Sequence, residues 1–225
     1  MSRPAAGFIF GMFLLPLPML FFARFIIPEG IAVGPRLLVG AMVFTTGLNA
    51  VNMLANGLIS DRFTYRLALI RARPIHPFAY AAAMMLTSAG QAVVNASALL
   101  IFAPIFGIDI DFSLWFFPVI MLTAVSLTGI ALIIGTWSPS WELGNRIASI
   151  AGIFIVLMSP IYFPISRLPD WLQVPAHFSP YTYAANALDA ILSGRSDFGS
   201  DIAILAGITA VGVAVGAAGM RWREV

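Results

Sequence analysis

Six long apolar runs divide the sequence, and only short polar segments separate most of them. A helix needs about 20 apolar residues to cross the hydrocarbon core of a bilayer. In this chain 60% of the residues are hydrophobic and 10% are charged, whereas a soluble domain carries roughly a quarter charged residues. We therefore exclude a soluble enzyme and a disordered chain, and predict an all-α polytopic membrane protein with a single domain over residues 1–225. The six predicted transmembrane helices cover residues 8–27, 37–59, 78–102, 114–137, 147–161 and 202–220.

The arginines indicate how these spans are oriented. All 12 basic residues are Arg, and loops rich in basic residues stay on the cytoplasmic side. With the N-terminus inside, the inner arginines are Arg3, Arg62, Arg66, Arg71, Arg73, Arg146, Arg221 and Arg223, and the outer ones are Arg24, Arg36, Arg167 and Arg195. We therefore predict a cell-membrane protein with both termini in the cytoplasm. The net charge of +2 reflects this sidedness, so no nucleic-acid partner is expected.

Two residue types are absent from the sequence, namely Cys and Lys. The absence of Cys excludes a thiolate metal site and a cysteine nucleophile. The absence of Lys excludes a P-loop, whose phosphate-binding motif requires that residue. The HExxH and GxSxG motifs are missing as well. We predict no catalytic residue, no metal site and no cofactor in this chain, so any ATP must be bound by another protein.

The predicted inner loop at residues 61–73 has the pattern of a short amphipathic helix. Three of its arginines fall within about 40° of one another around a helix, and three apolar residues form the adjacent face. Asp61 is a candidate N-cap and Pro74 ends the helix. Its apolar face suits a membrane surface or a groove in a partner protein; alternatively, the loop is only a basic segment that fixes the topology. The residues concerned are Asp61, Arg62, Phe63, Arg66, Leu67, Ile70 and Arg73.

The predicted outer segment after the fifth span contains five prolines. They lie at positions 160, 164, 169, 175 and 180. Pro is tolerated in the first turn of a helix but not in its interior, so we predict two short helices at residues 169–174 and 180–192. Trp171, Tyr181 and Tyr183 suit the level of the lipid headgroups. The alternative is a folded cap that only shields the ends of the spans.

These two segments carry a family resemblance. The turn Leu168-Pro169-Asp170-Trp171-Leu172, followed by Ser179-Pro180, resembles the outer segment of ABC-2 type transporter permeases. The inner pairs Asp61-Arg62 and Pro74-Ile75 fit the same family. The resemblance implies an exporter subunit for a hydrophobic or amphiphilic substrate, such as a drug-like metabolite or a lipid-linked molecule.

The resemblance also implies the partners and the site residues. The inner helix resembles a coupling helix that docks on a separate ABC ATPase subunit, which binds ATP and Mg²⁺. A second permease copy, identical or different, completes the transporter in the lipid bilayer. The outer cap carries Pro169, Trp171, Pro180 and Tyr181.

Polar side chains form two stripes inside the predicted spans. One stripe in the second span has i, i+3, i+7 spacing, and the third span repeats it. Amides facing lipid are costly, so both stripes should face protein or a water-filled path. They serve either as hydrogen bonds between helices or as a substrate path or gate. The stripes consist of Asn49, Asn52 and Asn56, and of Ser88, Gln91 and Asn95.

Three functions remain open for such a chain. An ATP-driven exporter subunit is the first, and an ion-gradient-driven secondary transporter is the second. The absence of an ionisable pair at mid-membrane depth argues against the second. The third is a non-transporting membrane assembly subunit on the same fold. In the sixth span, Gly212 and Gly216 predict close packing against another helix.

Overall fold

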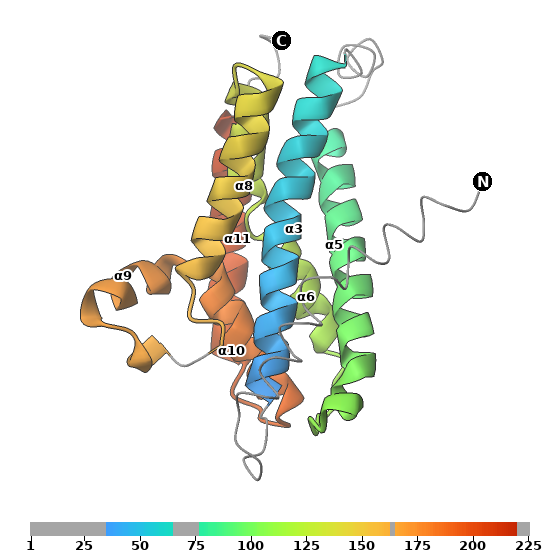
Figure 1. The fold of residues 1–225 in the computed structure, drawn as a ribbon, viewed down its shortest axis with the longest axis vertical. Helices are drawn as coiled ribbons and strands as arrows, with labels where there is room; N and C mark the ends of the chain where they lie inside the picture. The colour runs from blue at the N-terminus through green and yellow to red at the C-terminus, as the bar shows by residue number, and fades with distance from the viewer. Residues whose placement is uncertain (1–34, 65–76, 163–164, 220–225) are drawn as a thin grey trace, which may run out of the picture.

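The computed structural model describes residues 35–64, 77–162 and 165–219, and its regular elements within these ranges are helices. Most of them form an elongated bundle, and one short helix extends from its side (Figure 1). In chain order they are α3 (Pro35–Phe63), α5 (Pro77–Phe102), η1 (Ala103–Phe106), α6 (Phe116–Val125), α7 (Thr128–Trp137), α8 (Trp141–Leu157), η2 (Ile165–Arg167), α9 (Asp170–Phe178), α10 (Pro180–Leu192) and α11 (Gly199–Gly219).

Four segments of the described chain are long and apolar enough to cross a membrane. They are Pro35–Phe63, Phe78–Ile105, Phe116–Trp137 and Gly199–Gly219. They match the second, third, fourth and sixth predicted spans. The first predicted span lies outside the described residues, so the total of six spans stays a prediction.

The fourth span is a helix broken in its middle. Helix α6 ends at Val125 and α7 begins at Thr128. The hydroxyls of Thr123, Ser126 and Thr128 each donate to a backbone carbonyl three or four residues earlier, at 2.7 Å. Such bonds to the preceding turn bend helices and satisfy the hydroxyls internally. A break can therefore lie at membrane depth without leaving these side chains unpaired.

The fifth predicted span is shifted in the structure. The sequence predicts a helix over residues 147–161, but α8 begins at Trp141. Its N-cap is Ser140, whose side chain accepts a hydrogen bond from the Leu143 backbone N–H at 3.3 Å. The prediction began at the first long apolar run and overlooked this capping residue, so it missed the polar first turns of the helix.

Helix α8 also ends early, at Leu157. Pro160 follows, and proline disfavours helical backbone at the residue before it. The 17 residues of α8 span about 25 Å, at 1.5 Å per residue. This length is slightly below the roughly 30 Å of a hydrocarbon core, and α8 is not among the four candidate spans, so the fifth span stays a prediction.

Helix α3 occupies the centre of the bundle (Figure 1). It packs against α5, α6, α7, α8 and α10. Of its 29 residues, 15 are buried and most of these are apolar, which explains why hydrophobic residues appear all around it and not on one face. We call the end of the bundle where α3 begins the Arg36 end, and the end where α3 terminates the Arg62 end.

Glycines allow a close crossing between α7 and α11. A side chain at Gly129 would overlap the backbone of Gly212, and one at Gly216 would overlap the backbone of Gly129. Small residues of this kind let membrane helices approach closely. The predicted packing role of Gly212 and Gly216 is confirmed, and its partner is Gly129 on α7.

The proline-rich segment forms two helices, as predicted, but its first helix is longer. Helix α9 covers Asp170–Phe178 and continues through Pro175, whereas the sequence predicted an end at residue 174. Side chains of α10 explain the extension, because Thr182 and Tyr183 donate to carbonyls in the last turn of α9 at 2.7 and 2.9 Å. Helix α10 covers Pro180–Leu192, the predicted range, with Pro180 in its first turn.

Candidate functional site

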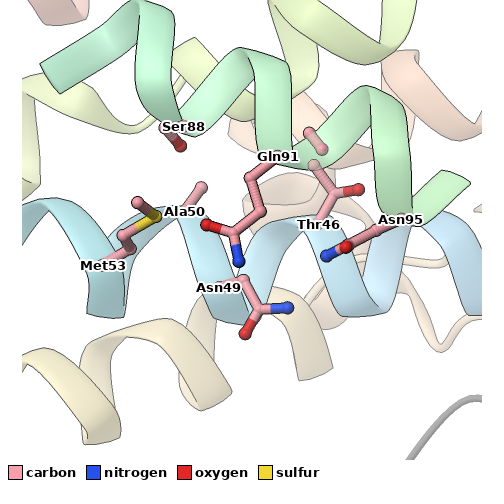
Figure 2. Close-up of a pocket in the computed structure, with 8 residues that line it drawn as sticks. Thr46, Asn49, Ala50, Met53, Ser88, Gln91 and Asn95 are labelled. Carbon is pink, nitrogen blue, oxygen red and sulfur yellow. The ribbon is translucent and has the colours of Figure 1, made fainter. Parts of the chain in front are cut away.

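Two polar seams run along α3, and the first lies between α3 and α5. The two helices enclose a small cavity of about 10 Å³, close to the volume that one water molecule needs. Figure 2 shows the polar side chains of both helices turned toward this space. The polar residues that line it are Thr46 and Asn49 from α3, and Ser88, Gln91 and Asn95 from α5.

The first seam changes from buried to exposed along its width. Thr46 and Asn95 are each 2% exposed. The Thr46 Oγ1 and Asn95 Oδ1 atoms have no hydrogen-bond partner among the described residues. Asn49 is exposed and Gln91 is half-buried. Buried polar atoms require hydrogen-bond partners. These two oxygen atoms can therefore accept hydrogen bonds from a water molecule or from a polar group of a ligand.

The second seam lies between α3 and α8. The Ser149 hydroxyl donates to Asn52 Oδ1 at 3.0 Å, and Asn52 Nδ2 donates to the Leu48 carbonyl at 2.8 Å. Asn56 and Asn145 each bury an Oδ1 atom that has no partner within the described ranges. The amides on α3 that the sequence places in one stripe are thus divided. Asn49 joins Gln91 and Asn95, whereas Asn52 pairs with α8.

The Arg62 end of the bundle contains residues predicted to dock an ATPase. Helix α3 continues through Phe63, so Asp61 is not the N-cap of a separate helix, and that prediction is wrong. The Tyr80 hydroxyl donates to Asp61 Oδ2 at 2.8 Å. The Arg62 guanidinium lies over the Phe63 ring, 5.2 Å from its centroid.

Arg62 joins α3 to the end of α7. Its Nη1 donates to the carbonyls of Thr136 and Ser138 at 2.9 and 2.7 Å. The last carbonyls of a helix lack partners within that helix, and a cation stabilises them. Sequence reasoning missed this role, because an arginine at the end of one span gives no signal of which helix end it caps. The remaining predicted docking residues, Arg66, Leu67, Ile70 and Arg73, lie outside the described residues.

The predicted outer-cap residues lie in two different environments. Trp171 is 74% exposed, consistent with a surface position, and Pro169 is the N-cap of α9. Tyr181 is fully buried, and its hydroxyl donates to the Gly47 carbonyl at 3.3 Å, near the middle of α3. The prediction that Tyr181 lies at headgroup level is wrong.

The buried helix α10 explains this difference. Nearly all of its residues are buried, and it packs against α3, α6 and α11. Helix α8 ends beside Gly47, where Val156 and Tyr181 both approach this glycine. Helix α10 therefore continues along α3 toward the Arg36 end, in the space that a longer α8 would fill. A sequence pattern of prolines and aromatic residues does not distinguish such an inserted helix from a surface cap.

A polar cluster that sequence reasoning missed occupies the Arg36 end. The Arg36 guanidinium donates to Asn186 Oδ1 and to the Pro160 carbonyl, both at 2.9 Å. Arg195 forms a salt bridge with Asp189 at 2.9 Å. These side chains border an open cavity of about 300 Å³. The cluster ties the start of α3 to α10 and to the segment that follows α8.

Tyr162 lies in the segment that follows α8, near this cluster. Its ring packs on Gly40 of α3. The Tyr162 hydroxyl is protonated at neutral pH, as an ordinary tyrosine is, and burial raises its pKa further. The segment after α8 is therefore attached to α3 by an uncharged aromatic side chain.

The apolar helices and the polar seams define a multi-pass membrane protein. The family model described as ABC-2 type transporter matches residues 3–192. This match covers more than half of the chain, and the protein belongs to the ABC-2 type transporter family as a permease. Members of this family are typically transmembrane subunits without a catalytic role, and they normally work with an ABC ATPase. No individual curated protein matches the chain.

Proposed function

We propose that this permease is the membrane subunit of an ATP-driven exporter that moves a hydrophobic or amphiphilic molecule out of the cell. A separate ABC ATPase binds ATP and Mg²⁺, because the sequence has no Lys and therefore no P-loop of its own. Two permease subunits and two ATPase subunits form the transporter. Both termini, and the Arg62 end of the bundle, lie on the cytoplasmic side.

The observation that carries the substrate proposal is the first seam, between α3 and α5. Asn49 exposes an amide near the middle of a helix that is long and apolar enough to span the membrane. An amide in that position is costly in lipid and is stabilised by a polar path or a second subunit. An apolar path with a few uncharged amides suits an amphiphile, whose polar group they bind by hydrogen bonds.

The ATPase docks on the inner loop. Asp61 and Arg62 already contact Tyr80, Thr136 and Ser138, so we assign docking to the following residues Arg66, Leu67, Ile70 and Arg73. Arg62 then connects the docking loop to the end of α7, and the second seam connects α3 to α8. ATP-driven movement of the loop would alter these contacts and open a path toward the outside, a two-state mechanism that requires different contacts in each state.

Inside-out membrane vesicles test this function. Vesicles with and without the chain are compared for uptake of rhodamine 6G, a cationic dye, and of a fluorescent phosphatidylcholine. We expect uptake of at least one probe that requires both ATP and the chain, and that a non-hydrolysable ATP analogue does not support. Uptake that needs no ATP but stops when ionophores collapse the ion gradients would instead establish a secondary transporter.

A further inference from the structure

Thr46 differs from the other threonines of the chain in what its hydroxyl contacts. Each of the others donates a hydrogen bond from its side chain to a backbone carbonyl, in most cases three or four residues earlier. The adjacent Thr45, for example, donates to the Ala41 carbonyl at 2.6 Å. Thr46 is buried, and its Oγ1 atom has no partner among the described residues. Its hydroxyl therefore remains available to a group in the cavity of the first seam, which Thr46 lines.

Asn95 supplies a second such atom, from α5. It is buried as deeply as Thr46, and its Oδ1 atom has no partner within the described ranges either. Both side chains line the same small cavity (Figure 2). The Asn95 Oδ1 atom only accepts hydrogen bonds, whereas a threonine hydroxyl can donate one. A group that satisfies both atoms at once must donate to Asn95 and accept from Thr46.

The size and the charge of the cavity restrict the chemistry of that group. Its volume of about 10 Å³ leaves room for roughly one group of the size of water. A hydroxyl fits and both donates and accepts, whereas an amide needs more room, and an ether oxygen or a quaternary ammonium group cannot donate. The described residues that line the cavity are all uncharged, and a charge without a counter-charge is costly at membrane depth. The cavity therefore favours an uncharged hydroxyl group.

A ligand can reach this buried position from the exposed side of the seam. Asn49 is exposed and Gln91 is half-buried, and both line the same cavity as Thr46 and Asn95. A water molecule in the cavity would form the same two hydrogen bonds. A ligand hydroxyl that displaces water reproduces these bonds, whereas an ether or a methyl group loses them and binds more weakly. The seam can thus distinguish an alcohol from the corresponding ether.

We propose that Thr46 and Asn95 form a hydroxyl-binding site, and that the exported molecule is an uncharged amphiphile with a free hydroxyl group. The hydroxyl accepts a hydrogen bond from Thr46 Oγ1 and donates one to Asn95 Oδ1, and the rest of the molecule leaves the seam past Asn49 and Gln91. This assignment rests on the proposed function, because it takes the bound hydroxyl to belong to the transported substrate.

Equilibrium binding to the complete chain tests the site without ATP or an ATPase. The protein is reconstituted in phosphatidylcholine nanodiscs, and binding of tritiated hexadecan-1-ol is measured after subtraction of binding to empty nanodiscs. Unlabelled hexadecan-1-ol and its methyl ether are then compared as competitors. Thr46→Val and Asn95→Leu remove the two proposed hydrogen bonds. Thr45→Val is the matched control, because it removes the neighbouring hydroxyl, which donates to the Ala41 carbonyl of its own helix.

We expect saturable binding of the alcohol, with the methyl ether competing about tenfold less well, as the loss of one buried hydrogen bond predicts. Thr46→Val and Asn95→Leu should each weaken binding by about tenfold, and Thr45→Val should not. Equal competition by the alcohol and the ether, equal effects of Thr45→Val and Thr46→Val, or no saturable binding would each overturn the site. The last result would mean that the cavity holds water only.

The vesicle assay separates this inference from the proposed function. Hexadecan-1-ol should inhibit the ATP-dependent uptake of a transported probe more strongly than its methyl ether does. ATP-dependent uptake that both compounds leave unchanged would overturn the substrate assignment and leave the exporter function intact. Absence of ATP-dependent uptake of any probe would instead contradict the exporter function, and with it the assignment of the hydroxyl to a substrate, while the binding result would still decide whether the site exists.

Discussion

At the residue scale, Arg62 and Arg66 are four positions apart, but we expect them to have different roles. Arg62 caps two carbonyls at the end of α7, whereas Arg66 is assigned to the ATPase contact. Hydrogen bonds from a charged group contribute about 1.5–3 kcal/mol. Arg62→Gln should therefore lower the free energy of unfolding by about 1–3 kcal/mol, measured by thermal unfolding in detergent.

The matched variant Arg66→Glu should leave the thermal unfolding unchanged and uncouple transport from ATP hydrolysis. It reverses a charge at the proposed docking surface and leaves Arg62, which contacts the end of α7, unchanged. ATP-dependent uptake in vesicles measures this effect, after quantification of the protein in the membrane. Normal uptake by Arg66→Glu would contradict the docking role of the loop.

The asparagines of α3 give a second residue-scale comparison. Asn49 is exposed at the first seam, whereas Asn52 accepts the Ser149 hydroxyl and donates to the Leu48 carbonyl. Asn49→Leu should lower transport and leave stability within about 0.5 kcal/mol, as for exposed positions. Asn52→Leu should destabilise the protein by about 1 kcal/mol, because it removes the hydrogen bond to the half-buried Ser149 hydroxyl.

Uptake assays and thermal unfolding of both variants check this difference. A loss of stability in Asn49→Leu that matches the loss in Asn52→Leu would assign both amides to packing. Asn49 would then no longer support a substrate path along the first seam.

At the element scale, the crossing of α7 and α11 depends on glycine. Gly129→Val should prevent the close approach, because a Cβ at this position overlaps the Gly212 backbone. Overpacking of this kind typically costs about 1–3 kcal/mol. Gly207→Val, on α11, is the control, since no neighbouring helix among the described residues has an atom within 4 Å of its Cβ position.

The melting temperature of each glycine variant in detergent checks this prediction. Gly129→Val should unfold at a lower temperature than the unmodified chain, and Gly207→Val should not. Equal melting temperatures for all three proteins would show that the crossing does not determine stability.

The elements that the sequence predicted best are those with a strong local signal. Long apolar runs predicted α3, α5 and α11, and Pro180 marked the start of α10. The start of α8 was missed because Ser140 lies outside the apolar run. The sequence predicted that a separate helix begins at Asp61, but α3 continues beyond its apolar residues to Phe63. Contacts of Asp61 with Tyr80 and of Arg62 with the end of α7 stabilise this last turn.

At the scale of the whole molecule, pairings between distant segments could not be predicted. The polar spacing on α3 placed three asparagines in one stripe, but it did not indicate that Asn49 lies beside α5 and Asn52 beside α8. Tyr181 reaches Gly47 across 134 positions of sequence, and no local pattern contains that contact. The candidate site is therefore partly visible in the sequence, as a list of residues, while its two seams are visible only in the fold.

Affinity purification tests whether this permease works with a separate ATPase. The tagged, complete chain is extracted in mild detergent, and every co-purifying protein is identified and quantified. We predict an ABC ATPase in stoichiometric amount, lost or strongly reduced with Arg66→Glu and retained with Asn49→Leu. Recovery of the chain without any ATP-binding subunit, under conditions that preserve other ATPase–permease complexes, would show that this permease has no ATPase partner.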